Sequence, residues 1–108
     1  MQLYGYFRSS AAYRVRIVCN LKGLAFETVP IHLQKEGGQN LKPEYRAINP
    51  QMRVPALKID TGDVLTQSLA IIEYLDETHP DPPLLPKDAK GRARVRGQAQ
   101  IEIGRAHV

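Results

Sequence analysis

The first third of the chain alternates between the two hydrophobic periods that distinguish strands from helices. Residues 2–7 are rich in Tyr and Phe and predict a short strand. Ser9 and Ser10 then offer helix N-caps, which predicts a helix over 11–22. The apolar positions of that helix recur at helical spacing: Ala11, Val15, Val18 and Cys19. Residues 26–31 return to strand character, so this part of the chain predicts a strand–helix–strand unit.

The middle of the chain is polar and irregular until a hairpin begins. Residues 34–50 carry glycine and Asn-Pro turn signals and predict a loop. Residues 55–59 predict a strand that opens with a proline, and residues 64–66 are expected to pair back across a Thr-Gly-Asp turn. Ser68 is expected to cap a second helix over 68–77. The inward face of this helix is predicted to be Ile71, Ile72 and Leu75.

Prolines crowd the segment that follows. Between His79 and Pro86 the chain contains Pro80, Pro82, Pro83 and Pro86. So many prolines exclude a helix interior and predict a stiff linker. A third helix is expected from Asp88 onward.

The order of these elements fits one α/β architecture. A strand–helix–strand unit gives a parallel pair of strands, whereas a hairpin gives an antiparallel pair. A four-stranded mixed sheet with flanking helices satisfies both conditions. The thioredoxin-like fold has this order of elements, so we expect that fold class.

Composition narrows the class of protein further. The 108 residues suit one modest core, and 43% apolar with 24% charged residues is typical of a globular chain. No apolar run reaches ~18 residues and the first residues lack signal-peptide features, so neither a membrane partner nor secretion is expected. Cys19 is the single cysteine, which predicts a reducing, cytoplasmic setting without a disulfide framework. One cysteine and three scattered histidines do not predict a metal site.

The basic charge lies in one terminal segment. Residues 1–86 carry nine Lys/Arg and nine Asp/Glu, whereas residues 87–108 carry the whole net charge of +4. We interpret Arg92, Arg94 and Arg96 as a solvated or partner-facing helix surface. The chain has no aromatic RNA-binding motif and no basic recognition helix, so no nucleic-acid partner is expected.

Three local features carry candidate chemistry. Ser9 and Ser10 fall at a predicted helix N-terminus, where free N–H groups and partial positive charge favour a thiolate or another anion. A cis bond before Pro55 would turn the backbone outward toward a peptide-like ligand. Gln67 and Ser68 fall at the start of another helix, suited to a carboxylate. Capping alone, and an ordinary edge-strand proline, remain open as simpler interpretations of these features.

In combination these features resemble one family. The run Tyr-Phe-Arg-Ser-Ser-Ala-Ala-Tyr-Arg-Val-Arg over residues 6–16 resembles the zeta-class glutathione transferase signature Y-F-R-S-S-C-S-W-R-V-R. Asn49-Pro50, Val54-Pro55 and the Gln-Ser-Leu-Ala-Ile-Ile-Glu-Tyr-Leu run over 67–75 resemble the same class. The similarity covers about residues 2–101 and is strongest to the maleylacetoacetate isomerase group.

The resemblance implies glutathione as the cofactor and a set of residues that hold it. Ser9 and Ser10 would flank the sulfur, with one donating to the thiolate, and Arg14 would be a third catalytic residue. Val54 would pair its backbone with the cysteinyl amide before a cis Pro55. The implied glutathione-binding residues are Ser9, Ser10, Ala11, Ala12, Tyr13, Arg14, Asn40, Val54, Pro55, Gln67 and Ser68.

The implied reaction is cis–trans isomerisation of maleylacetoacetate to fumarylacetoacetate in tyrosine and phenylalanine breakdown. A thiol must be shifted below its ordinary pKa of about 8.5 to add to the substrate at neutral pH, and a serine hydroxyl with a helix N-terminus can supply that shift. Ala11 and Tyr13 stand where the family has Cys and Trp. This departure keeps maleylpyruvate isomerase, or a general glutathione transferase, open as alternatives. A non-catalytic binding module is the alternative of another class.

The resemblance also implies a division of the chain. Residues 1–80 would form the glutathione-binding domain, 81–87 the proline-rich linker and 88–102 the start of a truncated helical domain. Full-length relatives of this kind would act as homodimers. Residues 103–108 match the translation of ATC GGA AGA GCA CAC GTC, a common sequencing-adapter stretch, which predicts an adapter-derived tail.

Overall fold

The computed structural model describes residues 1–106. Its four strands form one sheet in the order β2-β1-β3-β4. The strands are β1 (Gln2–Gly5), β2 (Glu27–Pro30), β3 (Ala56–Lys58) and β4 (Val64–Thr66); the helices are α1 (Ser10–Leu21), α2 (Pro43–Ile48), α3 (Ser68–Thr78) and α4 (Ala89–Ala106), with short 3-10 turns η1 (Lys35–Gly37) and η2 (Gln39–Leu41). β1 pairs with β2 in parallel and with β3 antiparallel, and β3 pairs antiparallel with β4. The predicted thioredoxin-like mixed sheet is therefore confirmed.

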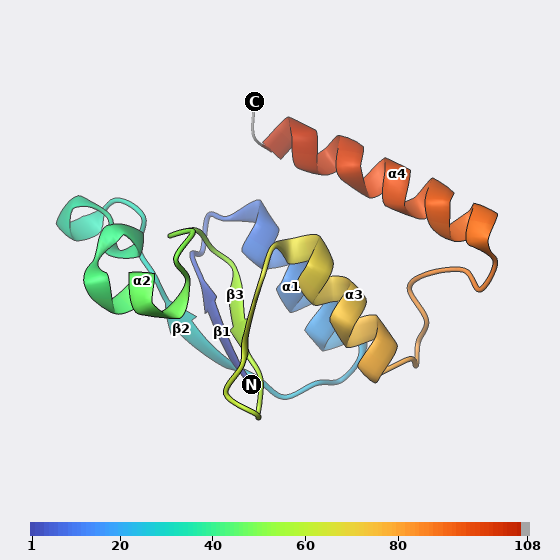
Figure 1. The fold of residues 1–108 in the computed structure, drawn as a ribbon, viewed down its shortest axis with the longest axis horizontal. Helices are drawn as coiled ribbons and strands as arrows, with labels where there is room; N and C mark the ends of the chain where they lie inside the picture. The colour runs from blue at the N-terminus through green and yellow to red at the C-terminus, as the bar shows by residue number, and fades with distance from the viewer. Residues whose placement is uncertain (107–108) are drawn as a thin grey trace.

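The helices lie on both faces of this sheet. Figure 1 shows α1 and α3 packed side by side on one face and α2 on the other. Successive residues of a strand point to opposite faces, so Leu3 and Leu57 are buried toward α1 and α3, while Tyr4 and Ala56 pack toward Tyr45 of α2. The rings of Tyr4 and Tyr45 lie 6.0 Å apart. Two small cores, one on each face, therefore hold the sheet.

The main core forms where the hydrophobic pattern predicted it. Val15, Val18 and Cys19 of α1 and Ile71 and Leu75 of α3 are buried in one cluster with the central strands. Ile72 is only partly buried at the edge of that cluster. In α1 the buried alanine is Ala12 rather than the predicted Ala11, which is partly exposed.

The helix α2 is a correction to the predicted loop over 34–50. It is six residues long, begins at a proline suited to the first helical position, and buries only Tyr45. One buried residue in so short a helix leaves no periodic signal in the sequence. The first three strands are also shorter than predicted, whereas β4 spans its predicted residues 64–66.

One buried lysine fastens the proline-rich linker to the body of the fold. The side chain of Lys22, fully buried after α1, donates to Asp76 Oδ1 at 2.9 Å and to the carbonyls of His79 and Pro82 at 2.5 and 2.7 Å. Asp76 Oδ1 also accepts from the backbone N–H of Leu84 at 3.0 Å. These bonds join the ends of α1 and α3 to the linker, and so fix where the chain leaves for α4.

The helix α4 begins next to its predicted start. Asp88 Oδ2 accepts from the N–H of Gly91 at 2.8 Å, and Arg96 pairs with Glu73 of α3. The helix runs to Ala106, and the last two residues of the predicted adapter-derived tail lie outside the described residues. No helix within residues 1–106 combines the length and the apolar character needed to cross a membrane.

Candidate functional site

A cavity of about 410 Å³ opens where the carboxyl end of β1 meets the N-terminus of α1. Its lining comes from three separate parts of the chain: the β1–α1 turn, the loop before α2, and the loop before β3. The residues are Tyr6, Arg8, Ser9, Ser10, Ala11, Leu33, Asn40, Met52, Arg53 and Val54. Five residues of the predicted glutathione set, Ser9, Ser10, Ala11, Asn40 and Val54, therefore meet around one cavity.

The serine pair occupies the helix N-terminus as predicted. Ser9 is the N-cap of α1, with extended backbone and with Oγ accepting from the N–H of Ala12 at 3.1 Å. Ser10 is the first helical residue and is exposed. The acceptor role of the Ser9 Oγ leaves its O–H free to donate. Two hydroxyl donors and the positive end of a helix thus face the cavity, an arrangement that stabilises an anion.

The loop before β3 presents free backbone groups to the cavity. The Val54–Pro55 peptide bond is cis, as predicted, and no hydrogen bond reaches the Val54 backbone within residues 1–106. Asn40 lies opposite and donates from Nδ2 to the Met52 carbonyl at 2.9 Å. Met52 has a positive φ of 56°, uncommon for a residue with a side chain. The loop is therefore held in a defined shape with an unpaired peptide edge.

The Gln67–Ser68 pair does not line this cavity, and one prediction about it is wrong. Gln67, not Ser68, is the N-cap residue of α3, and Ser68 is the first helical residue, where it is buried. Gln67 has φ +70° and ψ 119°, a sparsely populated conformation of the kind that clusters at functional sites. Its Nε2 donates to Gln51 Oε1 at 2.9 Å, which links it to the loop before β3.

Two arginines of the cavity were not among the predicted site residues. Arg8 and Arg53 both line it, and neither forms an ion pair within the described part of the chain. The guanidinium of Arg8 lies 5.3 Å from the centre of the Phe7 ring. The sequence could have indicated them, because Arg8 directly precedes Ser9 and Arg53 directly precedes Val54. They make the cavity electropositive.

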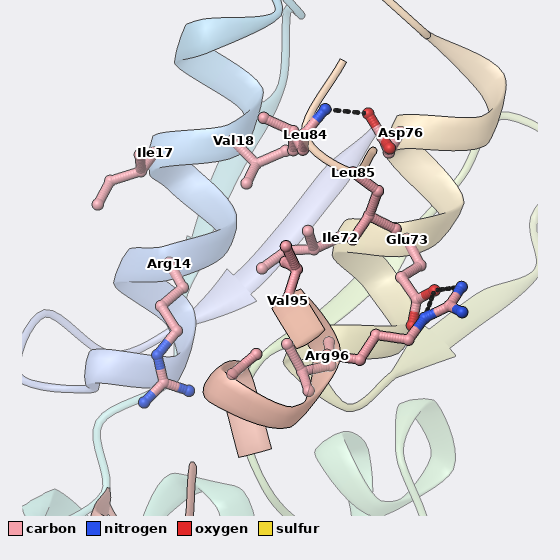
Figure 2. A pocket seen from close by; sticks show the side chains of 12 residues that line it. Arg14, Ile17, Val18, Ile72, Glu73, Asp76, Leu84, Leu85, Val95 and Arg96 are labelled. Carbon is pink, nitrogen blue, oxygen red and sulfur yellow. Dashed lines mark hydrogen bonds and ion pairs between the residues drawn. The ribbon is translucent and has the colours of Figure 1, made fainter. Parts of the chain in front are cut away.

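Three predicted site residues point elsewhere. Ala12 is buried in the core, and Tyr13 is 56% exposed with Arg16 over its ring. Arg14 lines a second cavity, of about 360 Å³, enclosed by α1, α3, the linker and α4. In Figure 2 the guanidinium of Arg14 points away from Leu84 and Leu85 on the far side of that cavity. A helix turns 100° per residue, so positions 12–14 cannot all face the site that Ser9 and Ser10 face.

The second cavity is apolar, with charged groups at its rim. Ile17, Val18, Ile72, Leu84 and Val95 supply much of its lining. Its two carboxylates are paired, Asp76 with Lys22 and Glu73 with Arg96. Figure 2 shows the second of these pairs and the hydrogen bond that Asp76 accepts from the Leu84 N–H. Burial alone would raise the pKa of Asp76. The hydrogen bonds from Lys22 and from the Leu84 N–H, with nearby positive charge, instead hold the pKa of Asp76 below its usual range.

The single cysteine takes no part in either site. Cys19 is fully buried in the core, as predicted. Burial raises the pKa of its thiol, so the neutral form prevails and the group is a poor nucleophile. Any thiolate used at the first cavity therefore comes from a bound molecule.

Comparison with known proteins identifies the family of this chain. Residues 3–83 match the family model described as "Glutathione S-transferase, N-terminal domain". Maleylacetoacetate isomerase of Pseudomonas aeruginosa is 52% identical over 101 residues, covering 94% of this chain and 48% of that protein. The chain therefore belongs to the glutathione S-transferase family, and its relatives place it in the zeta class.

Two solved structures extend the comparison. A maleylpyruvate isomerase, described as a zeta-class bacterial glutathione S-transferase, superposes with a TM-score of 0.86 at 50% identity, covering 94% of this chain and 46% of that one. A maleylacetoacetate isomerase from Methylobacterium extorquens AM1 with bound malonate and glutathione gives 0.85 at 51% identity, with the same coverage. The chain spans a little under half the length of these relatives.

Proposed function

We propose that the first cavity binds glutathione and that the protein carries out glutathione-dependent cis–trans isomerisation of maleylacetoacetate to fumarylacetoacetate. One observation carries the proposal: the serine pair, Asn40 and the free Val54 backbone come from distant parts of the chain and line one cavity. The names of relatives at about 50% identity support it.

The donor set fits glutathione. The unpaired N–H and C=O of Val54 suit the backbone of a peptide, which adds to an exposed edge through main-chain hydrogen bonds. Ser9 and Ser10 suit a thiolate at the helix N-terminus. Gln67 and Ser68 are proposed to hold the γ-glutamyl carboxylate beyond the mouth of the cavity, and the link between Gln67 and Gln51 supports their place beside it.

When bound, glutathione would supply the thiolate for addition to the cis double bond and its later elimination, between which the resulting single bond can rotate. The chain's own task is to keep that sulfur ionised. The hydroxyls of Ser9 and Ser10 donate to it, and the N-terminus of α1 adds partial positive charge. Neither hydroxyl needs to gain or lose a proton during the reaction.

The two unpaired arginines suit an acidic substrate. Maleylacetoacetate carries two carboxylates, and Arg8 and Arg53 are positioned to attract one or both. The Methylobacterium extorquens relative was solved with malonate, itself a dicarboxylate, together with glutathione. Arg14 is proposed as a further catalytic residue from the resemblance to the zeta class, although it lines the second cavity rather than the first.

Maleylpyruvate is a second candidate substrate. A maleylpyruvate isomerase is 50% identical to this chain, against 52% for the maleylacetoacetate isomerase of Pseudomonas aeruginosa, and the two substrates share the maleyl group. Ala11, which lines the cavity where the class signature has cysteine, does not separate them. The serine pair argues against a purely non-catalytic binding module, which has no need of thiolate donors.

We propose the remaining features from the resemblance to the zeta class. Residues 1–80 form the glutathione-binding domain, 81–87 the linker, and α4 opens a helical domain. The protein acts as a homodimer in the cytoplasm. The free, buried Cys19 supports a reducing compartment.

The test is a glutathione and isomerase assay on two proteins. One is the 108-residue chain, and the other joins residues 1–101 to the remaining part of the Pseudomonas aeruginosa relative. We expect the fusion to bind glutathione and isomerise maleylacetoacetate, and the 108-residue chain to bind glutathione weakly, to self-associate and to be inactive. A correctly folded fusion that fails to bind glutathione would refute the proposed function. Comparing maleylpyruvate as substrate separates the two candidates.

A further inference from the structure

Asn49 lies at the centre of the loop that shapes the cavity, yet it does not line the cavity. It is the residue that ends α2, its N–H donates to the Tyr45 carbonyl at 2.8 Å, and only 1% of it is exposed. A buried amide side chain must satisfy its own donors and acceptor inside the protein. Its partners therefore show what it holds in place.

Those partners are three consecutive residues of the loop. Asn49 Oδ1 accepts from the N–H of Gln51 at 2.9 Å, and the Asn49 carbonyl accepts from the N–H of Met52, also at 2.9 Å. Asn49 Nδ2 donates to the carbonyl of Arg53 at 2.9 Å. Every residue between Pro50 and the free peptide edge is thus bonded to Asn49.

The Arg53 carbonyl receives a second donor from α2. Tyr45 Oη donates to it at 2.5 Å. Burial raises the pKa of Tyr45, with the neighbouring Tyr4 adding to the rise, so the phenol stays protonated and can donate. Two donors from α2 and its C-terminus therefore hold the carbonyl that directly precedes Val54.

The same network reaches the other end of the proposed glutathione site. Gln51, whose N–H is held by Asn49, accepts at Oε1 from Gln67 Nε2 at 2.9 Å. Gln67 is the residue with the positive φ that begins α3. Asn49 is thus hydrogen-bonded directly to the residue before Val54 and, through Gln51, to Gln67.

We propose that Asn49 is a positioning residue that sets, through its bonds to residues 51–53, the two parts of the site that hold the glutathione backbone. This inference rests on the proposed function, since it assigns those parts to glutathione. Asn49 acts on the binding of the cofactor rather than on the sulfur, because Ser9 and Ser10 are carried by the start of α1, with which Asn49 shares no hydrogen bond in the described residues.

The discriminating variant is Asn49→Asp. It keeps the size of the side chain and the acceptor for the Gln51 N–H, but it replaces the donor to the Arg53 carbonyl by an oxygen. In the active fusion we expect the KM for glutathione to rise about ten-fold, as one lost buried hydrogen bond implies, with kcat at saturating glutathione within about two-fold of the parent. A merely structural role would lower kcat through a smaller folded fraction and leave KM unchanged.

Two further variants calibrate that result. Tyr45→Phe removes one of the two donors on the Arg53 carbonyl, so its KM effect should be smaller than that of Asn49→Asp. Asn20→Asp makes the same chemical change at an exposed position of α1 and should change neither constant. If Asn49→Asp leaves the glutathione KM unchanged, or lowers kcat alone, the inference is overturned.

A ligand-free measurement keeps this separate from the proposed function. In the 108-residue chain, amide hydrogen exchange at Gln51 and Met52, whose N–H groups are bonded to Asn49, should be faster in Asn49→Asp than in the parent, with exchange in α1 unchanged. If the parent fusion binds no glutathione but this exchange pattern holds, the proposed function fails while the positioning role of Asn49 stands. Unchanged exchange at these amides overturns the role itself.

Discussion

Two cavities of similar volume, about 410 and 360 Å³, lie at different places along α1 and differ in how their polar groups are used. At the N-terminus of the helix, Arg8 and Arg53 line the first cavity without an ion-pair partner in the described chain, and the side chain of Ser10 makes no hydrogen bond there. Farther along the helix, the second cavity is lined by apolar side chains, and Glu73 and Asp76 at its rim are each paired.

This difference separates binding from packing. Polar groups that face a cavity without protein partners are available to a ligand, whereas paired charges around apolar side chains stabilise the arrangement of helices. We therefore expect substitutions at the first cavity to change glutathione binding or rate, and substitutions around the second to change stability. The following predictions test this division, in order of decreasing effect.

The largest effect is expected from the Lys22–Asp76 ion pair, which lies beside the second cavity and holds the proline-rich linker. Lys22→Ala leaves the largely buried carboxylate of Asp76 without its cation, and breaking a buried pair in this way costs ~3–5 kcal/mol of the free energy of unfolding. Urea denaturation measures the loss, with Lys58→Ala, an exposed lysine, as the control. If the variant is unfolded throughout, the milder Asp76→Asn provides the comparison. A folded variant whose glutathione affinity drops while its stability holds would contradict the division.

The serine pair should show the opposite behaviour. In the active fusion, replacing both Ser9 and Ser10 by Ala should lower kcat by ~10²–10³-fold, because donors aimed at developing charge are lost. Glutathione affinity should change much less, since the peptide backbone is held elsewhere. Steady-state kinetics with isothermal titration separates the two quantities. Full activity in the double variant would assign thiolate activation to the helix N-terminus alone.

The two serines should differ from each other in stability. Ser9 Oγ accepts from the N–H of Ala12, so Ser9→Ala should lower the free energy of unfolding by about 1 kcal/mol. Ser10 is exposed and makes no side-chain hydrogen bond within residues 1–106, so Ser10→Ala should leave stability nearly unchanged. Thermal unfolding of both single variants measures the difference. Equal losses would show that the cap does not depend on Ser9.

The smallest effect concerns acid. Asp76 has a lowered pKa in the folded protein, so its ion pair contributes stability that is fully present above the unfolded pKa of about 3.9. That contribution is lost as the pH falls below this value through the folded pKa. The Asp76→Asn variant should therefore lose less stability than the parent does when the pH falls from about 5 to about 3. Identical acid unfolding curves would show that this carboxyl does not set the acid response.

The main fold follows from patterns that are local in sequence. The helical spacing around Val15 and Cys19, and the hairpin signal before residues 64–66, are each contained within a few residues, and both are confirmed. The α2 helix was not predicted, because one buried tyrosine gives no periodic pattern. The cap of α3 was assigned to Ser68 because serine is a common N-cap, yet Gln67 takes that position with a positive φ.

The sequence by itself determined the order of the four strands and of α1, α3 and α4, the two serines at the first helix and the proline before β3, because each depends on neighbours in the chain. Tertiary structure decided which residues face one cavity. Arg14 lies only a few residues from Ser10, but the turn of the helix carries it to the other cavity. Asn49 holds the Arg53 carbonyl only after α2 and the loop pack together. Contacts of this kind depend on the direction of each side chain and on packing between elements, which a linear pattern does not contain.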